Sequence, residues 1–268
     1  MANERMTETE KARLMAGREN IYRKPLCSGN PVWKACQRLL WYCLALPMFH
    51  LVYRPFFGLK VENHDVIRRL HGQGFVIVCN HVHVMDSIMV AIAASPRHPF
   101  FTSQEETFYI RGLRTLLRVL NCVPILKEQQ GLQMFLDSMV AQLKKGRPVL
   151  VYPEAEIRVL CDHLRKFSNG AFTLAHRADV PVVPMVITPR ERKGLWKLLR
   201  RRFCLTITIG EPLRPLREKT PERLAVIDLR ERTIARMEQM LENGGHAYPP
   251  EDLHNPDAFW QVKKSKQI

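Results

Sequence analysis

Short apolar runs alternate with longer amphipathic stretches from residue 75 onward, and this alternation limits the possible folds more than any other feature. Phe75–Cys79 (FVIVC) is apolar at every position, as expected for a strand buried on both faces of a sheet. Phe100 and Phe101 are expected to begin a short strand, and further strands are expected at 149–152, 182–187 and 205–209. Helical periodicity is found at 86–94, 129–145, 169–177 and 221–241, and Gly146 follows the second of these as a stop signal. The pattern predicts an α/β fold with a mixed, largely parallel sheet flanked by helices.

The composition fits one sizeable α/β domain with additional elements at both ends. The chain has 268 residues, of which 46% are apolar, so a core can form and global disorder is excluded. Seven cysteines are scattered without any C-x-x-C spacing, which argues against a disulfide framework or zinc knuckle and fits a reducing compartment. The net charge of +15 favours acidic partners such as nucleic acid, anionic lipid headgroups or phosphorylated small molecules.

The first hydrophobic stretch follows a polar start that does not resemble a cleavable signal peptide. This stretch, 39–58, has about the length that spans a bilayer, but Pro47, His50, Arg54 and Pro55 interrupt it. We interpret it as a helical segment at the membrane interface, with a spanning helix and an ordinary core helix as alternatives. The expected organisation is a polar and interfacial N-terminus (1–58), a catalytic domain (59–243) and an extended basic tail (244–268).

A polar cluster directly follows the first buried strand and precedes a helix, where α/β folds place active sites. It contains Asn80, His81, His83 and Asp86. Within a continuous helix, the five-residue separation of His81 and Asp86 would turn their side chains about 140° apart. The two can therefore meet only if His81 lies on the strand-to-helix turn and Asp86 in the first helical turn. In that geometry Asp86 would orient the imidazole and leave its other nitrogen as a base.

A second polar cluster follows the strand expected at 149–152. It contains Glu154 and Arg158, and it would share a sheet edge with His81 if the two strands are parallel. The planar guanidinium of Arg158 is suited to bind a phosphate. Considered alone, the cluster is better explained as a solvated loop that holds an Arg–Glu pair.

Five motifs in order resemble the glycerolipid acyltransferase family, typified by 1-acyl-glycerol-3-phosphate acyltransferase, over roughly residues 58–242. The family's N-H-x-x-x-x-D motif is matched by Asn80, His81 and Asp86, and its F-P-E-G-T-R motif is similar to 152–158. The remaining similarities are 167–172 (FSNGAF), 180–184 (VPVVP) and 210–212 (GEP).

Several positions depart from the family pattern on the side that binds the acceptor. His83 stands where the family usually has Ser, and Ala155-Glu156 replaces Gly-Thr. In the second motif, Asn121 replaces Gly and Lys127 replaces Arg. Asn can adopt the left-handed backbone that Gly permits, and Lys keeps the charge but loses bidentate binding. These departures do not affect the residues expected to carry out acyl transfer. They do mean that the acceptor cannot be identified from the motifs.

The resemblance implies an O-acyltransferase of phospholipid biosynthesis in which His81 is the general base and Asp86 supports it. Asn80, Lys127, Glu154 and Arg158 would position the acceptor, a lysophospholipid. The donor would be acyl-CoA or acyl carrier protein, with no cofactor and no metal. An acceptor that resides in a bilayer implies a protein associated with the cytoplasmic face of a membrane, with no nucleic-acid partner.

Two other interpretations stay open. One is a metal-dependent hydrolase that uses His81, His83 and Asp86 as ligands. The other is a non-catalytic basic protein that binds membranes, because 190–202 combines seven positive charges with Trp196 and three leucines.

Overall fold

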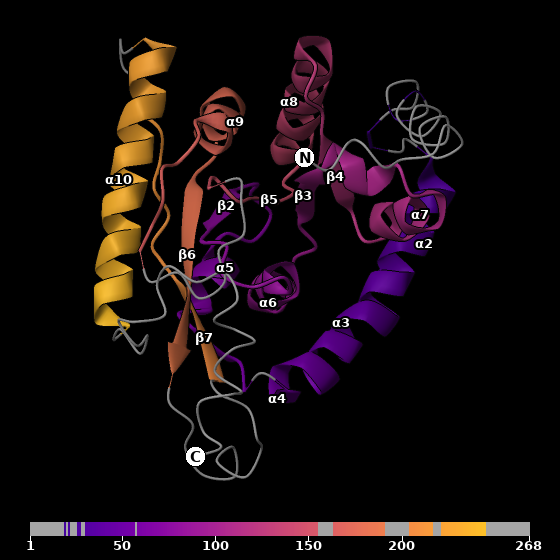
Figure 1. Ribbon diagram of the computed structural model, residues 1–268, viewed down its shortest axis with the longest axis horizontal. Coiled ribbons are helices and arrows are strands. Elements are labelled where there is room, and N and C mark those ends of the chain that lie inside the picture. Colours follow the sequence, from indigo (N-terminus) through magenta and orange to yellow (C-terminus); the bar gives the residue numbers. More distant parts are fainter. Residues whose placement is uncertain are drawn as a thin grey trace, which may run out of the picture.

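The computed structural model describes residues 30–56, 58–154, 163–190, 204–216 and 221–244, together with residues 19, 21, 26 and 27. Seven strands form one sheet in the order β1-β7-β6-β2-β5-β3-β4 (Figure 1). Among the described strands, β6, β2, β5, β3 and β4 run parallel to one another, β1 runs parallel to β7, and the β6–β7 pair is antiparallel. Their bounds are β1 Lys60–Glu62, β2 Val76–Cys79, β3 Phe100–Gln104, β4 Cys122–Ile125, β5 Val149–Val151, β6 Val182–Arg190 and β7 Cys204–Ile209.

Helices cover both faces of this sheet. The helices α8, α9 and α10 pack side by side, and α9 and α10 contact β2 and β6 (Figure 1). The opposite face carries α6, as right-handed crossovers between parallel strands require. The bounds are α5 Asp65–Arg69, α6 Asp86–Ala93, η3 Glu105–Phe108, α7 Arg111–Val119, α8 Gln129–Lys144, α9 Gly170–Ala178 and α10 Glu222–Asn243.

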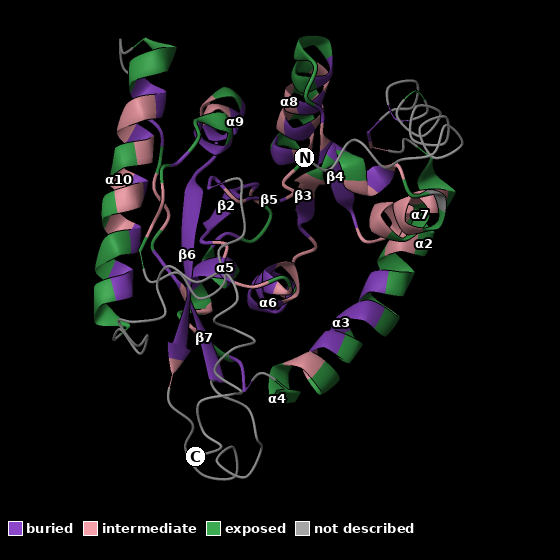
Figure 2. Cartoon of the chain, viewed as in Figure 1, coloured by how far each residue is buried: buried purple, intermediate pink, exposed green. Residues whose placement is uncertain are grey.

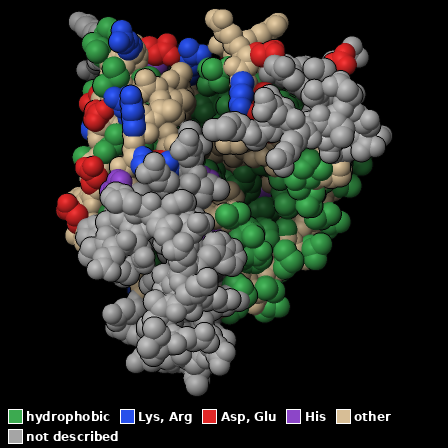
Figure 3. All heavy atoms as spheres, viewed as in Figure 1, with side chains coloured by type: hydrophobic (Ala, Val, Ile, Leu, Met, Phe, Trp, Pro, Cys, Tyr) green, Lys and Arg blue, Asp and Glu red, His purple; other side chains and the backbone are tan. Residues whose placement is uncertain are grey.

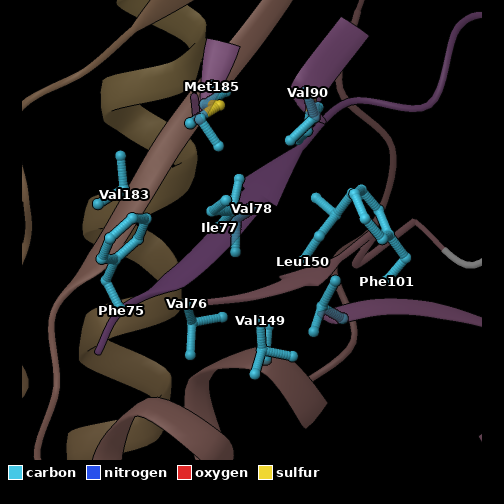
Figure 4. Packing of buried hydrophobic residues seen from close by; sticks show 14 of the residues in the cluster. Phe75, Val76, Ile77, Val78, Val90, Phe101, Val149, Leu150, Val183 and Met185 are labelled. Carbon is cyan, nitrogen blue, oxygen red and sulfur yellow. The ribbon is translucent and has the colours of Figure 1, made fainter. Parts of the chain in front are cut away.

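The centre of the sheet is the hydrophobic core. Every residue of β2 is fully buried, and Ile77 lies opposite Leu150 of β5 and Val183 of β6 (Figure 4). Helices on both sides leave no polar position in such a strand, which explains its continuous apolar sequence. A large-to-small substitution such as Ile77→Ala would cost about 2–5 kcal/mol of stability.

The N-terminal helical run lies outside α6 and curves along the molecule (Figure 1). It begins after Asn30, whose side-chain Oδ1 accepts a hydrogen bond of 2.9 Å from the backbone N–H of Val32. Its parts are α2 Pro31–Leu40, η1 Trp41–Ala45, α3 Leu46–Met48, η2 Phe49–Tyr53 and α4 Arg54–Phe56, of which η1 and η2 are π-helical turns.

One side of this run belongs to the core and the other is exposed (Figure 2). Trp41 stacks on His98 with ring centroids 3.9 Å apart, and Phe49 is also buried. Leu44 and Leu51 remain 60% and 80% exposed. Among the described residues, none of the helices has both the length and the apolar character needed to cross a bilayer. The run thus combines features of two of the interpretations drawn from the sequence, the core helix and the interfacial segment.

The expected α/β architecture is confirmed, with small differences in the elements. All of the expected strands and helices are present, and Gly146, with φ +77°, follows α8 as predicted. The pattern missed β1, α5, α7 and β4, and β6 extends three residues beyond Ile187.

Candidate active site

His81 and Asp86 meet on the turn between β2 and α6, in the geometry expected from their spacing. Helix α6 begins at Asp86, and its Oδ2 lies 3.0 Å from Nδ1 of His81. The same oxygen accepts hydrogen bonds from the backbone N–H groups of Val82 (2.7 Å) and His83 (2.9 Å). Asp86 is fully buried, whereas the His81 side chain is 16% exposed. The carboxylate therefore holds both the turn and the imidazole.

Asn80 locks this turn to the neighbouring strand. Its Nδ2 donates to the carbonyl of Ile187 at 3.1 Å, and its Oδ1 accepts from the N–H of Ile187 at 2.8 Å. The carboxamide thus continues the pairing of β2 with β6 one residue past the end of β2. This geometry gives Asn80 a positioning role, and its predicted contact with substrate stays a prediction.

An aromatic ring directly after β5 packs against the imidazole of His81. The ring of Tyr152 stacks on His81 with centroids 4.0 Å apart and planes 14° from parallel. Its hydroxyl lies 3.3 Å from Oγ of Ser87 on α6. Burial, with a further contribution from Asp86, raises the pKa of Tyr152 well above its ordinary value, so the phenol stays neutral. Tyr152 and Ser87 therefore restrict the orientation of the His81 ring.

His83 lies on the same turn but faces a different partner. Its Nδ1 accepts a hydrogen bond of 3.0 Å from the backbone N–H of Met85. Burial lowers the pKa of His83, which favours the neutral ring. Within the part of the chain that the structure describes, no three His, Cys, Asp or Glu side chains are placed to hold a metal ion. The hydrolase interpretation stays a prediction.

Glu154 lies at the carboxyl end of β5, on the sheet edge that carries His81. Arg165 donates to its Oε2 from Nε at 3.1 Å and from Nη2 at 2.9 Å. The two side chains are 2% and 13% exposed, so the ion pair is buried. Among the described atoms, Oε1 of Glu154 is buried without a hydrogen bond. This ion pair joins Glu154 to Arg165 at the edge of the sheet that carries His81.

Lys127 follows β4, the outermost strand, on the same carboxyl edge of the sheet. Its side chain is 64% exposed and pairs with Glu106. The backbone N–H of Lys127 donates to the buried carboxylate of Glu105 at 3.0 Å, which anchors this end of β4. Asn121, before β4, has φ 60°, so it does adopt the left-handed backbone expected at this motif position.

Several predicted residues lie outside the described part of the chain. These are Arg158, the altered motif positions 155–157, the basic stretch 191–202 and the tail from residue 245. Their predicted roles stay predictions.

The exposed apolar face of the N-terminal run adjoins the catalytic turn. The hydroxyl of Tyr53 lies 3.9 Å from the Sδ of Met85, the residue before Asp86. Hydrophobic side chains gather over α3 and α4 at the lower right of Figure 3. The exposed apolar side chains of the run are Val32, Leu39, Leu40, Tyr42, Leu44, Met48, Leu51, Val52 and Phe56, and we call this set the apolar face.

Sequence reasoning missed the supporting residues Tyr152, Ser87 and Arg165 as members of the site. Each of these residues joins the site through a contact that forms only in the folded chain. Of the three, only Arg165 could have been anticipated from the amino-acid sequence. A carboxylate at the end of a buried strand requires a cationic or hydrogen-bonded partner, which directs attention to nearby arginines.

Comparisons with known proteins find similar sequences and a similar fold. The Acyltransferase family model matches residues 58–188. The 1-acyl-sn-glycerol-3-phosphate acyltransferase of Bacillus subtilis (strain 168) is 27% identical over 157 residues, which cover 58% of this chain and 74% of that protein. The crystal structure of the 1-acyl-sn-glycerophosphate (LPA) acyltransferase from Thermotoga maritima shares the fold, with a TM-score of 0.51 and 22% identity over 89% of this chain and 83% of that chain. Over residues 58–188 the chain is thus similar to the glycerolipid acyltransferases, which are O-acyltransferases.

Proposed function

We propose that the protein transfers a fatty acyl group from acyl-CoA or acyl carrier protein to a hydroxyl of a lysophospholipid-like acceptor. The observation that carries the proposal is the pairing of His81 with the buried Asp86 at the carboxyl edge of the sheet. A carboxylate that accepts from Nδ1 keeps the proton of the neutral ring on that nitrogen. The lone pair of Nε2 is then available as a general base.

The proposed reaction needs no nucleophile from the protein. Nε2 of His81 removes the proton of the acceptor hydroxyl as its oxygen attacks the thioester carbonyl carbon. Asp86 stabilises the imidazolium formed in this step. When the tetrahedral intermediate collapses, the C–S bond breaks and the proton on Nε2 passes to the leaving thiolate. The products are an ester and a free thiol.

The acceptor headgroup would bind on the same sheet edge. The exposed ion pair of Lys127 with Glu106 is held weakly, so Lys127 can exchange its carboxylate for a phosphate. Arg158 is the second proposed phosphate ligand, on the sequence argument given above. Glu154 is already bound to Arg165, so we propose that it holds Arg165 in place and does not contact the acceptor itself.

The apolar face would bring the site to the bilayer in which such an acceptor resides. Leu39, Leu44 and Leu51 are each at least 60% exposed, and the same run contacts Met85 at the catalytic turn. Buried apolar surface contributes about 25 cal/mol per Å², a term that salt does not screen. The proposed location is therefore a membrane surface on its cytoplasmic side.

A panel of donors and acceptors tests the activity. Purified protein would be given a radiolabelled palmitoyl group on CoA or on acyl carrier protein, with lysophosphatidic acid, lysophosphatidylglycerol or lysophosphatidylcholine as acceptor. We expect labelled diacyl product with at least one anionic acceptor. Release of free labelled fatty acid at the same rate with and without every acceptor would indicate a thioester hydrolase and reject the proposal.

A further inference from the structure

A cationic cavity lies on the opposite edge of the sheet from His81. It has a volume of about 390 Å³, in the range of about 300–1,000 Å³ typical of small-molecule sites. Its lining includes Phe100 and Cys122, the first residues of β3 and β4, and Arg147, just before β5. His81 follows the last residue of β2, and these strands are parallel, so the two sites lie at opposite ends of the strands.

The cavity collects positive charge that the described structure leaves unbalanced. Lys34 of α2, Arg114 and Arg118 of α7, and Arg147 line it, and no acidic side chain appears among its described lining residues. None of these four cations takes part in an ion pair between described residues. Nε and Nη2 of Arg118 are buried there, and neither has a hydrogen-bond partner among the described atoms.

The electrostatic surroundings disfavour this cluster when no anion is bound. Burial lowers the pKa of Arg118, and the neighbouring Arg114 lowers it further. Burial also lowers the pKa of Arg147, followed by the effect of Arg38. Burying a guanidinium without a partner costs free energy, so a fold that places Arg118 beside Arg114 and Arg147 in one cavity favours a bound anion.

The shape of the donors indicates the kind of anion. Guanidinium groups present planar pairs of N–H donors that match phosphate oxygens, and several together suit a group with more than one negative charge. Phe100 and Trp33 supply an aromatic wall, and the guanidinium carbon of Arg147 lies 5.5 Å from the centroid of the Phe100 ring.

We propose that this cavity binds a phosphate-bearing ligand through Arg114, Arg118 and Arg147, at a site separate from the catalytic edge of the sheet. The phosphate can come from a soluble molecule or from an anionic lipid headgroup. A lipid headgroup could enter the cavity from a membrane bound to the apolar face. Helix α2 supplies Lys34 to the cavity and also carries Val32 and Leu39 of the apolar face. This inference does not depend on the proposed function.

The test compares the melting temperature of the full chain in neutral detergent with and without phosphate ligands. Pyrophosphate and dihexanoyl phosphatidic acid represent the soluble and lipid sources. Potassium chloride at equal ionic strength and dihexanoyl phosphatidylcholine are their controls. Saturating ligand should raise the Tm of the wild type by several degrees, because ligand that binds only the folded state stabilises it. The ligand class, soluble or lipid, is assigned from the compound that gives the larger rise in Tm at equal concentration.

The double variant Arg114→Gln/Arg118→Gln should lose most of this rise. Without ligand, its Tm should equal or exceed that of the wild type, because two repelling cations have been removed. The variant Arg236→Gln removes a cation from α10, which lies away from the cavity, and should retain the rise. An equal rise in the double variant, an equal rise with potassium chloride, or no rise with either phosphate ligand would overturn the proposal. A lower Tm of the ligand-free double variant would show that the arginines are internal structural groups and would also overturn it.

Discussion

At the scale of the residue, Asp86 connects the backbone of the turn between β2 and α6 to the imidazole of His81. Its Oδ2 accepts three N–H donors, and its other oxygen is buried without a hydrogen bond among the described atoms. We expect Asp86→Asn to lower kcat by on the order of 10²–10⁴-fold, because an amide can neither stabilise an imidazolium nor hold its tautomer. Steady-state transfer rates at saturating donor would measure the effect.

A surface carboxylate provides the control for this substitution. Asp65 on α5 is 69% exposed and pairs with Arg69, away from the turn. Asp65→Asn should leave kcat near the wild-type value. Similar losses in the two variants would mean that Asp86 has no special catalytic role.

The ion pair of Glu154 with Arg165 should contribute to stability, since both groups are buried. Arg165→Ala leaves an uncompensated carboxylate, which we expect to cost about 3–5 kcal/mol in the free energy of unfolding. Urea denaturation would measure the loss. Arg177→Ala breaks the exposed pair with Glu222 and should change stability little. If the two variants lose equal stability, the pair after β5 is not a structural support.

At the scale of the element, the strands buried on both faces gave the clearest sequence signal. The central strands β2, β5 and β6 read as continuous apolar runs because helices cover both sides of them. The edge strand β4 was missed because its sequence, Cys122–Ile125, contains Pro124. Proline is tolerated in β4 because the strand pairs on one side only, which the sequence cannot show before the strand order is known.

The candidate site was predictable to the extent that its residues are close in sequence. His81 and Asp86 lie on one turn, so their spacing alone defined how they could meet. Tyr152 stacks on His81 only because β5 pairs with β2, and Asn80 reaches Ile187 only because β6 does. Arg165 donates to Glu154 across a separation of 11 residues. Such contacts depend on strand order, which local patterns do not encode.

The apolar face should be the element that binds membranes. We expect the double variant Leu44→Asp/Leu51→Asp to bind phosphatidylglycerol vesicles at least tenfold more weakly. Burying a leucine side chain in the membrane contributes about 1.5–3 kcal/mol of binding free energy, and the variant loses this contribution at both positions. Cosedimentation would measure it. The control variant Leu224→Asp/Leu216→Asp introduces the same two charges outside the apolar face, at leucines that are 55% and 48% exposed. It should bind the vesicles nearly as well as the wild type. Equal losses would assign the effect to charge rather than to the apolar face.

At the scale of the whole molecule, charge and apolar surface should act together at the membrane. The net charge of +15 attracts an anionic leaflet, and salt screens this attraction over about 10 Å at 0.1 M. High salt should therefore release the protein from membranes only partly, and detergent should release it fully. Sedimentation after each wash would show this, and complete release by salt alone would contradict it. Deleting the N-terminal run is an unsuitable test, because Trp41 and Phe49 belong to the core.

The central claim is that His81 is the base of an acyl transfer reaction. The most direct measurement is the rate of ester formation by His81→Ala, compared with His71→Ala, which removes an exposed histidine from a turn outside the site. We predict that His81→Ala loses on the order of 10²–10⁴-fold in rate while its Tm stays within a few degrees of the wild type, and that His71→Ala keeps the wild-type rate. A His81→Ala protein that forms the ester at the wild-type rate would contradict the account.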